Sequence, residues 1–211
     1  MGINTLNDSA WSVLSTFGEV VFTEPMPMQE FIRLCERFPD LLIERDREGK
    51  VIVMAPVKSA SGRNEGYLFG YLFAWFLGAG KPGEVYSPST GFRIGKEEVR
   101  CGDATWVSAE RLQQFHTEPN HGKKFVAAVP DFVVEVKSDT DRINKLKTKM
   151  SDTWMAAGVR LGWLIDPDAE VAYIYRAGIV KPEEVRGFTN ATLSGEDVLP
   201  GFVFPLVELS V

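Results

Sequence analysis

The strongest constraint on the fold of this chain is a short apolar segment, residues 130–137, which reads Pro-Asp-Phe-Val-Val-Glu-Val-Lys. Its β-branched and aromatic residues predict a buried strand. Successive side chains of a strand point to opposite faces, so Glu135 and Lys137 are expected on one face and Phe132, Val134 and Val136 on the other. Burying charge is costly unless the charge is paired or binds a metal, so this strand carries a candidate site.

The segment after this strand predicts a parallel pair of strands. Residues 161–165 form a second apolar run, and residues 171–175 form a third after an Asp-Pro-Asp turn. Between the first two runs, residues 139–158 predict a helix with an apolar stripe, capped by Asp139 or Thr140. A helix between two neighbouring core strands is the usual connection of a parallel pair. The order strand, helix, strand, hairpin therefore indicates an α/β fold.

The length of 211 residues favours a single core. Residues 1–25 show no clear period and are expected to form an irregular N-terminal arm, and residues 26–211 a single domain. The other expected elements are helices near residues 27–38, 59–80 and 108–115, a hairpin over residues 41–54, and short strands at residues 84–86, 91–94 and 104–107.

The overall charge opposes indiscriminate binding to nucleic acid. The chain has 23 basic and 29 acidic residues, a net charge of −6, and phosphate backbones attract positively charged surfaces. A nucleic-acid role therefore needs a local basic patch. Residues 121–150 supply one, with seven basic and four acidic side chains.

Targeting signals and metal or disulfide spacings are not evident in the sequence. The two cysteines and the two histidines match neither a disulfide framework nor a zinc pattern. The first 22 residues do not read as a signal peptide. The uncharged residues 66–80 are shorter than the roughly 20 residues that span a bilayer. We therefore expect a cytoplasmic protein without membrane contact, in which residues 66–80 belong to a buried helix.

Three interpretations compete for the pair Glu135 and Lys137. They could form a structural ion pair at the end of the sheet, which contributes roughly 0–1 kcal/mol when solvent reaches it. Glu135 could instead bind Mg²⁺ or Mn²⁺ while Lys137 contacts an anion or water. A desolvated Lys137 could also act as a nucleophile that forms a Schiff base.

A metal site needs a second carboxylate near Glu135. Asp131 lies four residues earlier, roughly 13 Å away along a strand, which is too far to share one ion. Asp103 directly precedes a short strand that can pair beside Glu135, although it could equally be a turn residue after Gly102. Glu65 is a further candidate, whose alternative role is to favour the start of a helix.

Three cations follow the strand on the predicted helix. Arg142, Lys145 and Lys149 are spaced i, i+3, i+7 along one border of the apolar stripe. They could face a phosphate backbone or Glu135, or they could form a solvated helix face.

Several blocks of sequence together resemble one protein family, the Uma-two group of bacterial endonucleases in the PD-(D/E)XK, restriction endonuclease-like superfamily. The similarity runs from about residue 27 to the end of the chain, and the order and spacing of the blocks are specific. The blocks are Gly-Asp-Ala-Thr-Trp-Val at residues 102–107, Pro-Asp-Phe-Val-Val-Glu-Val-Lys-Ser at residues 130–138, Lys149-Met150, Gly-Val-Arg-Leu-Gly-Trp-Leu-Ile-Asp-Pro at residues 158–167, and Leu-Ser-Gly-Glu-Asp-Val-Leu-Pro-Gly at residues 193–201.

The resemblance implies a restriction endonuclease-like core, with a mixed β-sheet flanked by helices, and a metal-dependent phosphodiesterase site. The family's motif aspartate maps to Asp103, its strand glutamate to Glu135 and its helix acid to Glu65. The motif lysine maps to Lys137, and a lysine that members often carry on the next helix instead maps to Lys149. This chain keeps both lysines. It departs from the family where a Ser-Pro pair commonly precedes the aspartate.

The function implied is a Mg²⁺-dependent endonuclease that hydrolyses DNA by metal-activated water. Asp103 and Glu135 would hold Mg²⁺ or Mn²⁺, and Lys137 or Lys149 would orient the nucleophile or stabilise charge on the phosphate. The cations of the helix would bind DNA, and a homodimer is expected because paired sites cut two strands most simply. One alternative is a catalytically inactive nuclease-fold protein that binds nucleic acid or a protein. Another is an interaction protein with no nucleic-acid role.

Overall fold

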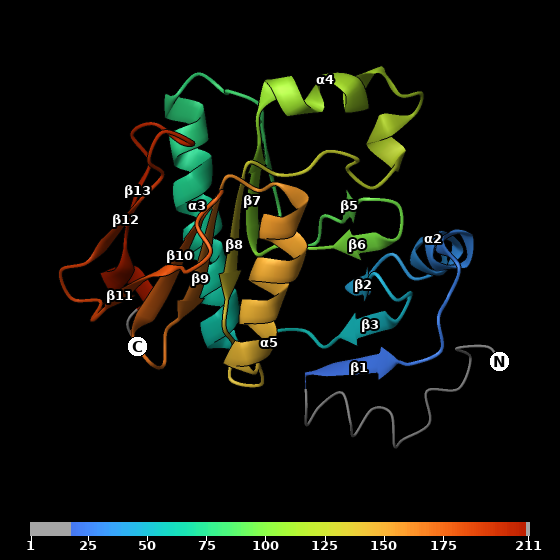
Figure 1. Ribbon diagram of the computed structural model, residues 1–211, viewed down its shortest axis with the longest axis horizontal. Coiled ribbons are helices and arrows are strands. Elements are labelled where there is room, and N and C mark those ends of the chain that lie inside the picture. The colour runs from blue at the N-terminus through green and yellow to red at the C-terminus, as the bar shows by residue number, and fades with distance from the viewer. Residues whose placement is uncertain (1–17, 210–211) are drawn as a thin grey trace.

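The computed structural model describes residues 18–209 and places a large sheet beside a small one (Figure 1). The large sheet has six strands in the order β11-β10-β9-β8-β7-β4. Their bounds are Glu183–Arg186 for β11, Val171–Arg176 for β10, Leu161–Asp166 for β9, Phe132–Val136 for β8, Ala104–Val107 for β7 and Glu84–Tyr86 for β4.

The small sheet has five strands in the order β1-β3-β2-β6-β5. Their bounds are Glu19–Phe22 for β1, Val51–Met54 for β3, Ile43–Arg45 for β2, Glu98–Arg100 for β6 and Phe92–Ile94 for β5, and helix α2 (Met28–Arg37) packs against this sheet through Phe31 and Leu34. The predicted hairpin is confirmed, because β2 and β3 pair antiparallel. Strand β6, which follows the turn at residues 95–97, was not predicted.

Strands β8 and β9 form the predicted parallel pair, with Phe132 opposite Leu161 and Val136 opposite Ile165. Strand β7 pairs antiparallel with β8, and β10 antiparallel with β9. The connection between β8 and β9 is α5 (Ile143–Thr148) followed by a π-helix, η3 (Lys149–Met155). The large sheet is therefore mixed, and its parallel core is joined by a helix as the sequence predicts.

Two apolar cores cover the two faces of the large sheet. Phe132 and Val134 of β8 belong to a core with Leu68 and Leu72 of α3 (Ser59–Gly78), whereas Val133 belongs to a core with Trp154. Helices α3 and α5 accordingly lie on opposite faces of the sheet (Figure 1). The alternation predicted for this strand is confirmed, and it directs Glu135 toward the α5 side.

Helix α3 differs from the buried helix that its uncharged sequence predicted. Leu68 and Leu72 are buried, but Tyr67 is 43% exposed and Phe73 is 41% exposed. Its apolar residues extend around most of the helix, and the sheet covers only one side. Within residues 18–209, no helix is long and apolar enough to cross a membrane.

The helix caps only partly match their predictions. Ser108 caps α4 (Ala109–Thr117), because its hydroxyl accepts a hydrogen bond from the Arg111 backbone N–H. Asp139 and Thr140 do not cap α5, which begins at Ile143 after Arg142. The Asp141 carboxylate instead accepts hydrogen bonds from the backbone N–H and the hydroxyl of Ser138, which closes the turn between β8 and the helix.

Additional strand pairs lie near both ends of the described residues. The expectation of an irregular arm does not hold for residues 19–22, which form β1 and pair with β3; residues 1–17 lie outside the described residues. Near the C-terminus, β12 (Thr192–Ser194) and β13 (Val203–Pro205) form a separate antiparallel pair, followed by the short helix η4 (Leu206–Leu209). The remaining short helix, η2 (His121–Lys123), follows α4.

Candidate active site

A cleft of about 960 Å³ lies between the small sheet, the start of α3 and the helix formed by α5 and η3. Five side chains from separate elements line it and carry the chemistry described below: Glu44, Glu65, Asp103, Glu135 and Lys149. Glu65 belongs to α3, Glu135 to β8 and Lys149 to η3, so the cleft collects charges that are distant in sequence.

Asp103 directly precedes β7 and is fixed there by hydrogen bonds to the backbone of β8. Its N–H donates to the carbonyl of Val134 over 2.9 Å, and its Oδ2 accepts from the N–H of Val136 over 2.6 Å. Burial raises the pKa of Asp103, and the charge of Glu65 raises it further. Gly102 permits this close approach, because a Cβ atom there would lie 2.6 Å from Val133 Cγ2.

Glu135 lies beside Asp103 on the next strand and is 4% exposed. Its Oε1 accepts a 2.7 Å hydrogen bond from the Trp154 indole N–H and lies 2.9 Å from the Lys149 ammonium. Burial raises the pKa of Glu135; Lys149 opposes this rise, and the negative charge of Asp103 adds to it. Two buried carboxylates thus destabilise each other's charge and share one nearby cation.

Lys149 occupies the centre of the charged cluster. Its Nζ lies 2.9 Å from Glu135 Oε1, 3.0 Å from Glu44 Oε1 and 2.8 Å from the Cys101 carbonyl oxygen. Burial alone would lower the pKa of Lys149, but the carboxylates of Glu135 and Glu44 raise it above the usual lysine value. The ammonium is therefore protonated at neutral pH.

Glu44, on β2, is a site residue that the sequence reasoning missed. Its Oε2 lies 2.9 Å from Arg100 Nη1, and its Oε1 accepts from the N–H of Cys101 over 2.9 Å. Although burial opposes ionisation, Lys149 and Arg100 lower the pKa of Glu44. A glutamate directly after Leu-Leu-Ile in a predicted strand was the available signal, but no local pattern indicated its partner.

The π-helix explains how two residues of one helix reach Glu135. Lys149 and Trp154 are five residues apart, and a π-helix is built on i to i+5 hydrogen bonds, which bring such positions onto one side. Their side chains both contact Glu135, and the Lys149 ammonium lies 6.0 Å from the centre of the Trp154 ring. Helical segments of this kind are frequent at functional sites.

Glu65 and Asp141 add further negative charge to the same cleft. Partial burial raises the pKa of Glu65, and the carboxylates of Asp141 and Glu135 contribute to the rise. Asp141 also acts on Asp103 in the same direction. Glu65 therefore shares the electrostatic environment of Asp103 and Glu135.

Lys137 was expected beside Glu135, but its side chain lies elsewhere. Strand β8 ends at Val136, and the Lys137 ammonium lies 2.9 Å from Asp168 Oδ2 and 3.7 Å from Asp166 Oδ1. The backbone N–H of Lys137 donates to the Ile165 carbonyl, which continues the parallel pairing while the side chain turns toward the β9–β10 turn. Lys149 is thus the lysine that the structure brings to Glu135.

Asp131 lies away from the site, as the distance argument predicted. It precedes the first residue of β8, where its Oδ2 accepts from the Ser108 N–H and its Oδ1 lies 3.1 Å from Arg111 Nε. These contacts tie the start of β8 to the start of α4.

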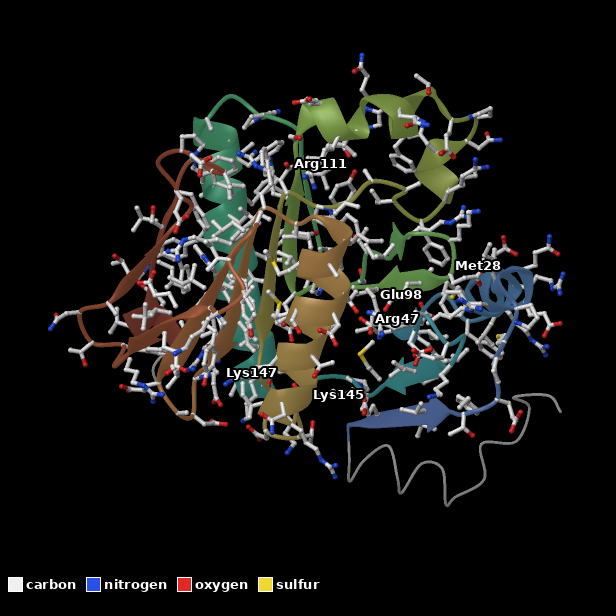
Figure 2. The ribbon with its side chains drawn as sticks, in the orientation of Figure 1. Met28, Arg47, Glu98, Arg111, Lys145 and Lys147 are labelled. Carbon is white, nitrogen blue, oxygen red and sulfur yellow. The ribbon has the colours of Figure 1, made fainter. Side chains whose placement is uncertain are left out.

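The cations predicted to bind DNA are separated in the structure. Lys149 is held inside the cleft, Lys145 forms an ion pair with Glu19 of β1, and Arg142 is exposed at the start of α5. Figure 2 shows Lys145 on the side of α5 that faces the small sheet and Lys147 on the opposite side, where its ammonium lies 3.9 Å from the centre of the Tyr173 ring.

The cleft is acidic rather than basic. Eleven acidic and six basic residues line it, which leaves a net charge of −5. The positive balance of residues 121–150 does not carry over, because only Lys145 and Lys149 of its basic residues line the cleft and the other elements contribute acids.

The carboxylates suit a hard divalent cation. Within residues 18–209, no three His, Cys, Asp or Glu side chains form a ready-made metal site. Asp103 and Glu135 supply two carboxylates, and Mg²⁺ is usually held by one or two carboxylates together with water and substrate phosphates. Burial raises the pKa of both groups, nearby carboxylates add to the rise, and a bound cation would stabilise both negative charges.

Comparisons with known proteins identify the family and support the fold. A family model described as "Uma2: Putative restriction endonuclease" matches residues 28–209. Among solved structures, the chain is similar to a putative nuclease belonging to DUF820 from Anabaena variabilis ATCC 29413, with a TM-score of 0.71 and 17% sequence identity. The match covers 88% of this chain and 97% of that one, and it confirms the predicted fold, a mixed sheet flanked by helices. No curated protein matches the chain.

Proposed function

Because this chain belongs to the Uma2 family of putative restriction endonucleases, we propose that it is a divalent-cation-dependent endonuclease that hydrolyses DNA. The observation that carries the proposal is the meeting of Asp103, Glu135 and Lys149 in one cleft, with two mutually repelling carboxylates beside a buried ammonium. Membership of the family supports the reaction class, and the geometry of the cleft supports the choice of residues.

Each of these residues has a distinct role in the proposal. Asp103 and Glu135 would hold Mg²⁺ or Mn²⁺, which would supply Lewis-acid stabilisation of the scissile phosphate and a water of lowered pKa. Lys149 carries a positive charge at neutral pH, so it stabilises negative charge on the phosphate rather than accepting a proton. Glu65 supplies a further carboxylate on the α3 side of the cleft. The environment of Lys137 assigns it instead to the turn between β9 and β10.

Isosteric variants of the two carboxylates test the proposal. Asp103→Asn and Glu135→Gln keep the shape of the side chains and remove their charge, so we expect both to abolish Mg²⁺- or Mn²⁺-dependent cleavage of plasmid DNA. Asp168→Asn removes an acid that contacts Lys137 and is the matched control, which should cleave like the wild type. Unchanged cleavage by both site variants, with folding verified by circular dichroism, would reject the assignment.

A binding module without cleavage is the second candidate function. Lys149 and Trp154 already satisfy the carboxylate of Glu135, and this observation favours a site that does not need a metal. Calorimetric titration with Mn²⁺ separates the two candidates. Binding that is lost in Glu135→Gln supports the nuclease, whereas an absence of binding by the wild type supports the binding module.

Cutting of both DNA strands is simplest with two sites, so the proposal includes a homodimer. Light scattering of the purified protein measures this directly, and a mass of 23.5 kDa would identify a monomer. The proposal also includes a cytoplasmic location.

A further inference from the structure

We propose that Glu44 is a positioning residue that fixes the Lys149 ammonium at the active site, which makes the small sheet part of the catalytic machinery. The inference rests on the proposed nuclease function and deepens it. Glu44 lies on β2, outside the strand and helix that carry Glu135 and Lys149, and it contacts Lys149 directly at 3.0 Å.

The hydrogen bonds of Lys149 define its position. An ammonium has three N–H donors, and here they face three acceptor groups: the Glu135 carboxylate, the Glu44 carboxylate and the Cys101 carbonyl. Two of the three acceptors belong to β2 and to the residue after β6. The small sheet therefore supplies most of the contacts that orient this ammonium.

Glu44 is itself held rigidly. It is 3% exposed, and its two carboxylate oxygens are bound by Arg100 on one side and by the Cys101 N–H and Lys149 on the other. A lysine has a flexible four-carbon stem and gains a fixed position only from its surroundings. A buried carboxylate with both oxygens anchored provides such surroundings.

The arrangement matters most when Glu135 has another partner. A cation bound by Glu135 competes with Lys149 for the same oxygens. The ammonium would then keep two acceptors, Glu44 and the Cys101 carbonyl, which hold it in the cleft. Without Glu44 the ammonium would keep one acceptor from the small sheet.

Glu98 offers a matched control for Glu44. Both are buried glutamates of the small sheet, and both contact Arg100, at 2.9 Å for Glu44 and 3.0 Å for Glu98. Glu98 binds the Thr153 hydroxyl rather than Lys149. A comparison of Glu44→Gln with Glu98→Gln therefore isolates the contact to Lys149 from the general effect of removing a buried charge.

The first readout is independent of catalysis. In ¹⁵N-labelled protein the Lys149 ammonium, assigned by its loss in Lys149→Met, should give a resolved Nζ–Hζ resonance because its protons are hydrogen-bonded. We expect this resonance to persist in Glu98→Gln and to broaden or vanish in Glu44→Gln. An unchanged Lys149 resonance in Glu44→Gln would overturn the proposal. If Glu44→Gln does not fold, Glu44→Asp, which retracts the carboxylate by one methylene, provides the same comparison.

The second readout is DNA cleavage at saturating metal. Misplacement of a reacting group lowers turnover by about tenfold to a hundredfold, and we expect this loss in kcat for Glu44→Gln with an unchanged KM for DNA. Glu98→Gln should retain a larger kcat than Glu44→Gln. Equal losses in the two variants would overturn the positioning role. If the wild type cuts no DNA, the nuclease proposal fails, while the resonance comparison still decides whether Glu44 fixes Lys149.

Discussion

Lys149 and Lys137 have the same side chain in different surroundings. Lys149 lies between two carboxylates whose side chains are 4% and 5% exposed, whereas Lys137 lies 2.9 Å from Asp168, whose side chain is 58% exposed, and 3.7 Å from the less exposed Asp166. When Lys137 is replaced, water can hydrate the carboxylate of Asp168 in its place. When Lys149 is replaced, water has little access to the carboxylates of Glu44 and Glu135, which as whole residues are 3% and 4% exposed.

A pair of lysine variants should therefore differ in stability. Removing one partner of a buried ion pair costs about 3–5 kcal/mol, so Lys149→Met should lower the free energy of unfolding by about 3 kcal/mol. Lys137→Met should cost about 1 kcal/mol or less, as partly exposed ion pairs do. Urea denaturation measures both values. A larger loss for Lys137→Met would contradict the placement of the two side chains.

The buried carboxylates also predict how stability depends on pH. The pKa is raised to about 7 in Asp103 and to about 8 in Glu135, by burial and by neighbouring carboxylates. Between about pH 4 and pH 8 the folded protein therefore binds more protons than the unfolded chain, and the free energy of unfolding falls as pH rises. Metal-free protein should be less stable at pH 8 than at pH 5.

Asp103→Asn provides the control for this pH dependence. The variant lacks one titrating group, so its loss of stability between pH 5 and pH 8, measured by urea denaturation in the presence of a chelator, should be smaller than that of the wild type. Equal losses would show that Asp103 ionises normally in the folded protein.

Among the elements, the strands of the large sheet follow their sequence closely. Strands β4 and β7 have the predicted bounds, β8 occupies residues 132–136 of the predicted segment 130–137, and β9 and β10 are each one residue longer than predicted, whereas β11 was not predicted. The apolar, β-branched runs of β7, β8, β9 and β10 are buried, so local composition and tertiary packing agree there. Strand β6 was missed because Glu98 and Arg100 read as exposed charges, whereas in the fold Arg100 contacts Glu44 and Glu98, and Glu98 also accepts a hydrogen bond from the Thr153 hydroxyl.

The candidate site was predictable where one strand or one motif carried it. Strand ends and spacing made Asp103 and Glu135 candidates, the resemblance to the Uma-two group selected them, and the structure brings them together. Glu44 could not be found this way, since its partner lies 105 residues later in the chain. Its role depends on how the small sheet docks against the helix, which no local pattern encodes.

The junction before β7 predicts a sharp response to a single methyl group. In Gly102→Ala the new Cβ atom would lie 2.6 Å from Val133 Cγ2 and 3.0 Å from Thr105 Cγ2. Overpacking of this kind costs about 1–3 kcal/mol, and it would also displace the neighbouring Asp103. Thermal or urea unfolding measures the loss.

Gly70→Ala is the matched control for this substitution. Among the described residues nothing lies within 4 Å of a Cβ atom at Gly70, inside helix α3. Alanine there should stabilise the protein by about 0.5–1 kcal/mol, because glycine is unfavourable within a helix. Equal effects of the two substitutions would contradict the close packing at Gly102.

At the scale of the whole molecule, the negative cleft should make DNA binding depend on divalent cations. The net charge of −5 around the cleft repels phosphates. We expect weak DNA binding in a chelator and at least about tenfold tighter binding in Ca²⁺, a hard cation that carboxylates and phosphates both bind. Fluorescence anisotropy of labelled DNA measures the difference. Equal affinity in both buffers would show that the cleft does not hold the DNA backbone.

The contact between Glu44 of the small sheet and Lys149 can form only after both residues have been synthesised. Glu44 leaves the ribosome 105 residues before Lys149. The hairpin of β2 and β3 can pair from local contacts. The Glu44 carboxylate, however, can contact Lys149 only after the residues of the π-helix have been synthesised. Domains generally fold as units during synthesis. A nascent molecule therefore holds an incomplete site until Lys149 has emerged, so the capacity proposed here is acquired late in the synthesis of this domain.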